Sequence, residues 1–326
     1  MPVTRDVLVI DAEKATREIG DALRTQVLAV LRRRGIVVGL SGGVDSAVVA
    51  ALAARALGRH AVLGVLMPER DASKESLTLG RSVADRLEIP HEVEDVTRAL
   101  DGAGCYERQT SAIREVFPSY GEGWTCKLTT PSLADGDRIT VFQLTVRSPE
   151  GAEHASRMPP AAYRQLVAAT NMKQRTRKAI EYYHADRLGY AVAGTPNRLE
   201  YELGFFVKQG DGAADVKPIA HLYKTQVYAL AAHLGVPEAI RSRPPTTDTF
   251  SMPQTQEEFF FALPYADMDL CLWALDHGVA ASEIAPTLDR PVGTVERVFR
   301  DIEAKRRTTR YLHTPPLLVG GDAAGT

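Results

Sequence analysis

The feature that most constrains the fold is a short apolar run that leads into two adjacent glycines and then into a helix-forming stretch. Residues 35–40 read GIVVGL, residues 41–46 read SGGVDS, and the alanine-rich residues 47–58 follow. A wholly apolar run rich in β-branched residues is typical of a strand that is buried on both faces of a parallel sheet. We therefore expect a buried strand, a tight loop and a helix in direct succession.

The same alternation of strand and helix recurs along much of the chain. Further strands are predicted at 61–68, 91–96 and 190–194, and helices at 13–34, 73–87, 160–188 and 224–234. Strands that alternate with helices in this way predict an α/β fold with a doubly wound parallel sheet.

Two regions depart from this alternation. Residues 101–160 predict a short helix and then strands around turns at 134–137 and 148–151, which indicates an inserted hairpin or small sheet. Beyond residue 250 the chain is predicted to be mostly helical. We therefore expect one domain over 1–326, with an inserted β-rich segment at 101–160 and a helical C-terminal extension at 250–326.

The composition excludes several classes of protein. The 39 Lys and Arg residues nearly balance the 41 Asp and Glu residues, so a basic surface for nucleic acid is not expected. The cysteines Cys105, Cys126 and Cys271 are too few and too widely spaced for a disulfide framework or a CxxC pair. With no apolar run long enough to span a bilayer and no signal-peptide pattern, we expect a cytoplasmic protein with no membrane partner.

The loop SGGVDS carries the sharpest chemical signal. Gly42 and Gly43 let the backbone approach a phosphate and direct N–H groups at it, and the Ser41 and Ser46 hydroxyls add further donors. The following helix adds the positive end of its dipole, and Asp45 is placed to hold a Mg²⁺ on the same phosphates. The pattern is neither the Walker A motif nor GxGxxG.

This loop resembles the PP-loop of ATP pyrophosphatases, the superfamily with the adenine nucleotide alpha hydrolase-like fold. Residues 193–227 closely resemble NAD synthetases of the ammonia-dependent type, through GTPNRLE, GFFVKQGDGAAD and LYKTQ. NMKQRTR at 171–177, PPTTD at 244–248 and AKRR at 304–307 add to the resemblance. Residues 66, 198–199 and 304 differ from the family's usual choices.

The resemblance implies a role for each matching residue. Contacts to ATP are implied for Ser41, Gly42, Gly43, Asp45, Ser46, Thr195, Lys224 and Thr246, with Asp45 and Lys224 catalytic. Contacts to deamido-NAD are implied for Arg175, Lys208, Asp211, Asp215 and Lys305, although a turn-forming role for Asp211 is nearly as well supported. Because Glu200 follows the fourth strand, at the sheet edge where α/β proteins bind ligands, we expect it to meet Asp45 and share the Mg²⁺.

The implied reaction uses ATP to activate a carboxylate. An acceptor carboxylate, that of deamido-NAD, attacks the α phosphorus and releases pyrophosphate, and ammonia then displaces AMP to leave an amide. Positioning and charge stabilisation supply the catalysis, so no Ser/His/Asp nucleophile is required. Free ammonia, or ammonia from a separate subunit, is expected because the chain has no room for a glutaminase domain, and the family implies a homodimer.

Three alternatives stay open at this stage. The same chemistry on a different carboxylic acid, in a specialised biosynthetic pathway, is suggested by the 101–160 insertion and by Leu66. A tRNA-modifying PP-loop enzyme fits poorly with the near-neutral charge. A nucleotide sensor without catalysis fits poorly with the retained Asp45, Glu200 and Lys224.

Overall fold

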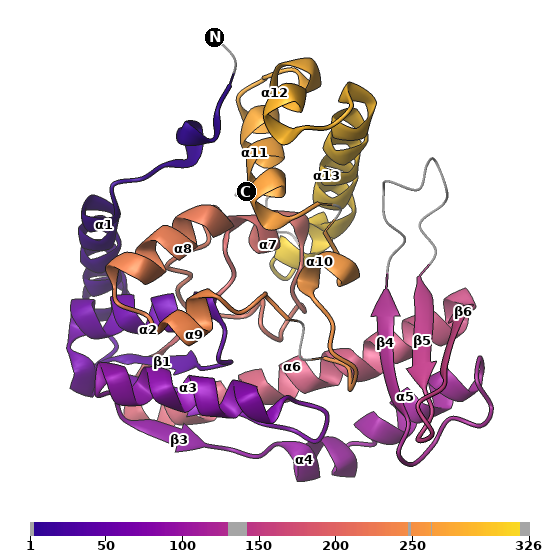
Figure 1. Cartoon of the computed structure of the whole chain (residues 1–326). Coiled ribbons are helices and arrows are strands. Elements are labelled where there is room, and N and C mark those ends of the chain that lie inside the picture. Colours follow the sequence, from indigo (N-terminus) through magenta and orange to yellow (C-terminus); the bar gives the residue numbers. More distant parts are fainter. Residues whose placement is uncertain (1–2, 130–141, 247–248, 262, 320–326) are drawn as a thin grey trace.

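The core of the molecule is a parallel sheet of four strands. In a computed structural model, which describes residues 3–129, 142–246, 249–261 and 263–319, the strand order is β3-β2-β1-β7 (Figure 1). The strands are β1 (Ile36–Gly39), β2 (Val62–Leu66), β3 (His91–Val93) and β7 (Ala191–Ala193). Ile36 of β1 pairs with Val62 on one side and with Ala191 on the other, so β1 is a central strand.

Helices cover both faces of this sheet, which is why β1 is apolar throughout rather than alternating. Ile36 and Val38 point into a core with α1 (Ala12–Arg24), α2 (Val44–Leu57), α3 (Lys74–Leu87) and α8 (Lys224–His233). Val37 points the opposite way, into a core with α4 (Thr97–Gly102), α5 (Cys105–Arg114) and α6 (Pro160–Leu188). The doubly wound fold is confirmed.

Two predicted elements have different limits in the structure. The helix expected over 13–34 leaves α geometry after Arg24, continues as a π-helical stretch over Thr25–Val30 and then stops. The chain turns there because the Arg34 N–H donates to the Gly189 carbonyl at 2.9 Å, which directs it into β1. The third strand ends at Val93 rather than at residue 96, because the Asp95 carboxylate accepts from the Thr97 N–H and starts α4.

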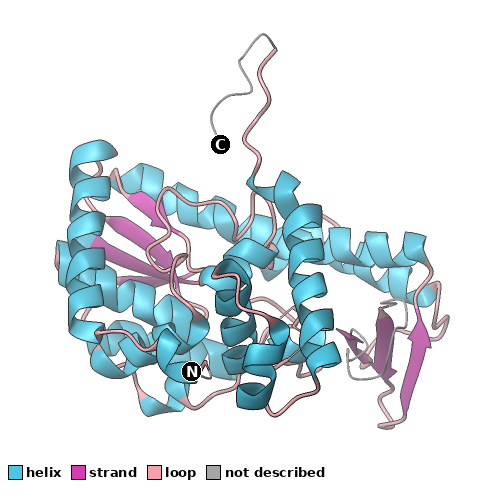
Figure 2. Cartoon of the chain, turned by 90° about the horizontal axis from the view of Figure 1, so that it is seen from above, coloured by secondary structure: helices cyan, strands magenta, loops and turns pink. Residues whose placement is uncertain are grey.

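The inserted segment forms a separate antiparallel sheet. Its strands β4 (Thr125–Thr129), β5 (Gln143–Arg147) and β6 (Glu153–Arg157) pair in that order, and Figure 2 shows this sheet at the opposite end of the molecule from the parallel one. Cys126, Leu128, Leu144 and Val146 are fully buried against the start of α6. The small β element is confirmed; the turn expected at 134–137 lies outside the described residues.

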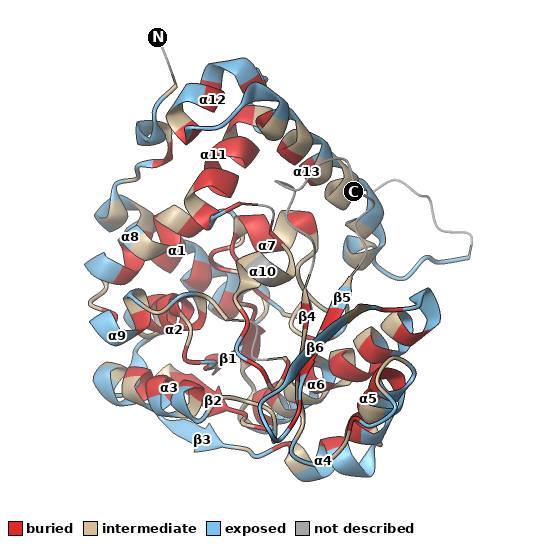
Figure 3. Ribbon diagram, turned by 45° about the vertical axis from the view of Figure 1, so that its right-hand side comes forward, coloured by how far each residue is buried: buried red, intermediate tan, exposed pale blue. Residues whose placement is uncertain are grey.

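The C-terminal part is helical, as expected, and has its own core. It contains α10 (Gln256–Phe259), α11 (Tyr265–Asp276), α12 (Ala281–Leu288) and α13 (Val292–His313), and it packs on α7 (Arg198–Leu203). Figure 3 shows α11 coloured as buried over most of its length, beside α12 and α13. Among the described helices none is both long and apolar enough to cross a membrane. The single-domain division stays a prediction.

Candidate active site

The loop between β1 and α2 has the backbone geometry that its glycines allow. Gly42 has φ of +79°, and a Cβ there would lie 2.5 Å from the Ser76 carbonyl oxygen. The two serines close the loop, because the Ser46 hydroxyl donates to the Gly43 carbonyl at 3.0 Å and the Ser41 hydroxyl accepts from the Gly43 N–H at 3.3 Å. The loop therefore stands at the N-terminus of α2 in one defined shape.

Gly42→Ala is expected to lower the free energy of unfolding by more than the backbone strain of its positive φ alone would. Gly278→Ala is the matched control, because Gly278 also has a positive φ, +67°, yet a Cβ there meets nothing within 4 Å. In urea unfolding we expect a loss of about 1 kcal/mol for the control and at least about twice that for Gly42→Ala, with weakened ATP binding only in the latter. Equal losses in both variants, with ATP binding intact, would contradict this close packing.

Asp45, in the first turn of α2, lies at the centre of a buried polar group. Its carboxylate forms an ion pair with the Lys224 ammonium, which is 1% exposed. It also accepts from the Asn197 side-chain amide at 3.2 Å. Asn197 in turn caps α7, because its side chain accepts from the Glu200 N–H at 3.1 Å while its own N–H donates to the Glu200 carboxylate at 3.2 Å. The expected meeting of Asp45 and Glu200 is thus supported through Asn197.

Burial and charge shift the protonation of this group. Burial, helped by the negative charge of Asp45, raises the pKa of Glu200 to about 8. Burial opposes the charge of Lys224, but the carboxylates of Asp45 and Glu200 outweigh it and raise the pKa of Lys224 to about 12. Both shifts favour a protonated Glu200 and a charged Lys224.

The raised pKa of Glu200 predicts how stability depends on pH. Between the ordinary carboxyl pKa and about 8, the folded state binds a proton that the unfolded state releases, so the free energy of unfolding falls as the pH rises through that window. Glu200→Gln removes the titration and is expected to flatten this part of the profile. Chemical denaturation at a series of pH values measures the slope, and an unchanged slope in the variant would contradict the assignment.

Two cavities meet at the glycine loop. The first, which we call the strand-end cavity, has a volume of about 170 Å³ and lies over the carboxyl ends of β1, β2 and β7. Its lining includes Leu40, Ser41, Leu66, Met67, Leu77, Arg177, Lys178, Glu181, Thr195 and Asp211. The second, the loop cavity, has a volume of about 80 Å³ and is lined by Ser41, Gly42, Gly43, Asp45, Lys224, Arg243 and Thr246, among others. One ligand that spans both would pass along the loop.

The residues predicted to contact deamido-NAD are spread over a wider region than those predicted to contact ATP. The Arg175 guanidinium donates to the Lys208 carbonyl at 3.2 Å, which joins α6 to the loop after α7. Asp211 accepts from the Val207 N–H at 2.7 Å, a turn-closing contact, and it also lines the strand-end cavity. Asp215 accepts from the Val192 N–H of β7 at 2.7 Å. The structure thus brings Arg175, Lys208, Asp211 and Asp215 to one loop beside β7.

Lys305 and Lys208 both contact the C-terminal region. The Lys305 ammonium donates to the Phe260 carbonyl at 2.6 Å and pairs with Asp301 at 2.8 Å, and it lines none of the cavities described here. The Lys208 ammonium donates to the Tyr311 and Thr314 carbonyls at the end of α13. The structure does not bring Lys305 together with the other four residues through any described contact.

A third cavity adjoins Lys208. This tail cavity has a volume of about 290 Å³ and is lined by aromatic and cationic side chains, including Tyr201, Phe206, Lys208, Lys217 and His313. The Tyr201 and Phe206 rings stack with centroids 6.0 Å apart, and the Lys217 ammonium lies 4.6 Å from the Tyr201 centroid. Burial, with the charge of Lys178 nearby, lowers the pKa of Lys217. Such a surface suits a planar, negatively charged group.

Several site residues carry no separate prediction from the sequence. Asn197 stands inside GTPNRLE, where the Asn three residues before Glu is a capping signal. Asp269 of α11 is fully buried and accepts from the Lys224 and Thr225 N–H groups at 3.2 and 2.8 Å. In the sequence it is one of three aspartates in a helix that is otherwise apolar, and nothing there distinguishes it from Asp267 and Asp276. The buried pair Lys178 and Glu181, 2.6 Å apart, also lines the strand-end cavity.

Fold and site together define an α/β nucleotide-binding protein with a glycine loop of the PP-loop kind. The sequence model of the family described as NAD synthase matches residues 15–115 and 140–311. The chain belongs to the NAD synthase family.

Curated relatives and solved structures agree with this family. An NH(3)-dependent NAD(+) synthetase of Mesorhizobium japonicum is 59% identical over 312 residues, which cover 96% of this chain and 98% of that protein. The protein of that name from Thermotoga maritima is 34% identical over 85% of this chain and 90% of its own. A solved NH3-dependent NAD synthetase from Campylobacter jejuni has a TM-score of 0.61 at 22% identity, covering 95% of this chain and all of that one. That structural likeness shows the fold.

Proposed function

We propose that this chain makes NAD by amidating the nicotinate carboxylate of deamido-NAD, with ATP as the activating cosubstrate and ammonia as the nitrogen donor. The observation that carries the proposal is the buried Lys224 ammonium, paired with Asp45 and lining the loop cavity beside the glycine loop, in a member of this family. A buried cation at a phosphate-sized cavity suits a reaction in which negative charge grows on leaving phosphates.

ATP fits the two connected cavities in one orientation. The apolar end of the strand-end cavity, with Leu40, Leu66 and Leu77, suits the adenosine, with Thr195 on its wall. The loop cavity offers the backbone N–H groups of the glycine loop, the Lys224 ammonium and Thr246 to the phosphates. The charged end of the strand-end cavity is left for the acceptor carboxylate.

The chemistry then follows in two balanced steps. One oxygen of the acceptor carboxylate forms a bond to the α phosphorus, and the bond from that phosphorus to the β-phosphate oxygen breaks to release pyrophosphate. Ammonia attacks the activated carbonyl, the carbon–oxygen bond breaks, and AMP leaves with that oxygen while one proton passes to solvent. Lys224 stabilises charge on the phosphates, and the loop holds the α phosphorus in line with the acceptor.

The residues present suit Mg²⁺, which we propose as the metal that accompanies ATP. Asp45 and Glu200 offer the hard oxygen ligands that Mg²⁺ prefers, and phosphate oxygens would complete the set. The raised pKa of Glu200 fits this role, because a nearby dication would restore its charge. Within the described residues no cluster of three or more metal-ligating side chains occurs, which fits a metal brought with the nucleotide. When bound, it would neutralise part of the triphosphate charge.

Deamido-NAD is proposed to bind along the loop after α7. Arg175, Lys208, Asp211 and Asp215 converge there, and the tail cavity beside Lys208 offers stacked rings and cations. Lys305, which contacts Phe260 here, is proposed to join this site when the substrate is bound. We further propose that the protein acts as a cytoplasmic homodimer, on the support of the family resemblance, and light scattering tests the dimer.

One assay tests the function and its nearest alternative together. Pyrophosphate release is measured with ATP, Mg²⁺ and ammonium in the presence of deamido-NAD or of other carboxylates. We expect strong stimulation by deamido-NAD, with ammonium preferred to glutamine. Stimulation only by another acid would favour a ligase for a different carboxylate, and efficient use of glutamine by the isolated chain would overturn the proposed nitrogen source.

A further inference from the structure

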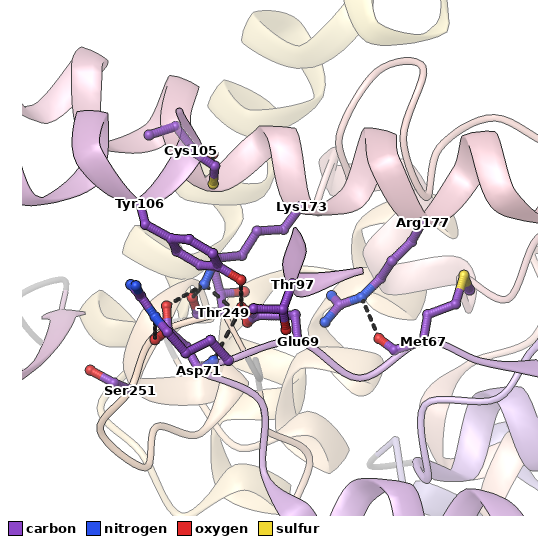
Figure 4. Close-up of polar contacts among 12 residues, drawn as sticks. Met67, Glu69, Asp71, Thr97, Cys105, Tyr106, Lys173, Arg177, Thr249 and Ser251 are labelled. Carbon is purple, nitrogen blue, oxygen red and sulfur yellow. Dashed lines mark hydrogen bonds and ion pairs between the residues drawn. The ribbon is translucent and has the colours of Figure 1, made fainter. Parts of the chain in front are cut away.

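A fully buried lysine of α6 lies at the centre of a polar cluster (Figure 4). None of the proposed contacts to ATP, Mg²⁺ or deamido-NAD involves this cluster. The Lys173 ammonium donates to the Glu69 carboxylate at 3.0 Å, to the Asp71 carboxylate at 2.7 Å and to the Thr249 carbonyl at 3.1 Å. The side chains of Lys173 and Glu69 are 0% exposed. Three acceptors satisfy the three donors of the ammonium, so the cluster has one favoured geometry.

The carboxylates of the cluster are themselves held in place. Glu69 accepts from the Tyr106 hydroxyl of α5 at 2.9 Å and from the Asp71 N–H at 3.1 Å. The Arg70 guanidinium lies 3.6 Å from the centroid of the Tyr106 ring. The cluster therefore joins four parts of the chain, namely the loop after β2, α5, α6 and the segment around Thr249.

Three of these parts form walls of the two cavities assigned to ATP. The loop after β2 supplies Met67 to the strand-end cavity, and α6 supplies Arg177, whose guanidinium also donates to the Met67 carbonyl at 3.2 Å. The described stretch 249–261, which contains Thr249, supplies Gln256 to the loop cavity, and the Gln256 N–H donates to the Pro245 carbonyl at 3.0 Å. Lys173 thus ties a wall of one cavity to a wall of the other.

The inserted sheet supports the same segment from its other side. The Cys126 N–H donates to the Ser251 hydroxyl at 3.0 Å, and the Met252 N–H donates to the Cys126 carbonyl at 3.0 Å. The Gln254 side-chain amide donates to the Leu128 carbonyl. Strand β4 therefore acts as a fixed edge against which residues 251–254 are held.

We propose that Lys173 is a positioning residue that sets the spacing between the strand-end cavity and the loop cavity, so that a single nucleoside triphosphate spans both. The inserted sheet acts as the brace for residues 249–255 in this arrangement. The inference rests on the proposed use of ATP. The inference therefore predicts that Lys173 affects the affinity for a ligand that spans both cavities more than the affinity for a ligand that occupies only one of them.

Binding of separate ligands tests this consequence. Calorimetry compares a non-hydrolysable ATP analogue, which spans both cavities, with adenosine and with pyrophosphate, each of which occupies one. For Lys173→Met we expect the analogue to lose about tenfold to hundredfold in affinity, and adenosine and pyrophosphate to lose clearly less. Lys173→Arg keeps the charge and the donors, and it is expected to restore most of the affinity for the analogue.

A matched control separates positioning from general destabilisation. His184 lies on the same helix, is 2% exposed and contacts the Glu94 carboxylate at 3.0 Å, yet it lines none of the three cavities. His184→Leu is expected to lower the melting temperature and leave the affinity for the analogue unchanged. Should Lys173→Met fail to fold, Asp71→Asn, which removes one charge from the cluster, is expected to show the same pattern more weakly.

Two results would overturn the inference. One is wild-type affinity for the analogue in a folded Lys173 or Asp71 variant. The other is an equal loss for the analogue, adenosine and pyrophosphate. Failure of the proposed function would look different, because the wild-type chain would then form no NAD from deamido-NAD whatever its affinity for the analogue.

Discussion

Lys224→Met is expected to reduce kcat for NAD formation by about a hundredfold to a thousandfold. The variant removes the buried cation that pairs with Asp45. Without it, the Asp45 carboxylate repels the phosphates instead of supporting a cation beside them. The effect belongs in kcat, because the charge on the phosphates grows as the bond to the α phosphorus breaks.

Controls separate this effect from a loss of folding. Lys14→Met removes a lysine whose side chain is 62% exposed, and it is expected to leave kcat unchanged. Lys224→Arg keeps the charge and is expected to recover part of the rate, less than fully because guanidinium and ammonium differ in shape. Steady-state kinetics and thermal unfolding of all three variants provide the measurement. A folded Lys224→Met protein with nearly wild-type kcat would show that this lysine does not act on the phosphates.

Asp269→Ala is expected to damage both stability and activity. Its two carboxylate oxygens accept from the first N–H groups of α8, those of Lys224 and Thr225; the first contact is buried and the second is partly buried. Truncation leaves these donors without a partner, for an expected loss of about 3 kcal/mol of unfolding free energy. Because α8 begins at Lys224, we expect the same change to loosen the Lys224 ammonium, which is proposed to act on the phosphates, and to lower kcat in the folded fraction.

Asp276→Ala on the same helix is the matched control. Asp276 contacts Arg198 and Arg306, and each of these arginines keeps a second partner in Glu202. We expect a small loss of stability and no change in kcat per folded molecule. Burial raises the pKa of Asp269 to about 6. Between the ordinary carboxyl pKa and about 6, the folded state therefore binds a proton that the unfolded state releases, and the free energy of unfolding falls as the pH rises through that window. If Asp269→Ala and Asp276→Ala behave alike, the link between α11 and the active site is wrong.

Local pattern was enough to predict the part of the fold that is proposed to bind ATP. The strand, loop and helix from residue 35 to 58 follow from apolar runs and paired glycines, which act over a few residues. The long helix was predicted at its observed limits, Pro160–Leu188, because proline and glycine mark its ends. The end of the helical run that begins with α1 escaped prediction. There Arg32 takes a positive φ of 51°, and the Arg34 N–H donates to the Gly189 carbonyl, far away in the sequence.

The site residues also divide into those that a local sequence motif predicts and those that depend on contacts distant in the sequence. Asp45, Glu200 and Lys224 stand in motifs whose spacing is visible in the sequence, and the structure brings them together through Asn197. Asp269 contacts Lys224, 45 positions before it in the sequence, and Lys173 contacts Glu69, 104 positions before it. Contacts between residues so far apart leave no periodic pattern in the sequence. Their roles become visible only once burial and partners are known.

The fate of a carboxylate oxygen tests the central claim most directly. Deamido-NAD labelled with ¹⁸O in its nicotinate carboxyl group is converted with ATP, Mg²⁺ and ammonium, and the AMP and pyrophosphate are analysed by mass spectrometry. Adenylation of the carboxylate predicts one labelled oxygen in each AMP, none in pyrophosphate, and one AMP for each NAD formed. Unlabelled AMP, label in pyrophosphate, or no NAD at all would contradict the proposed function.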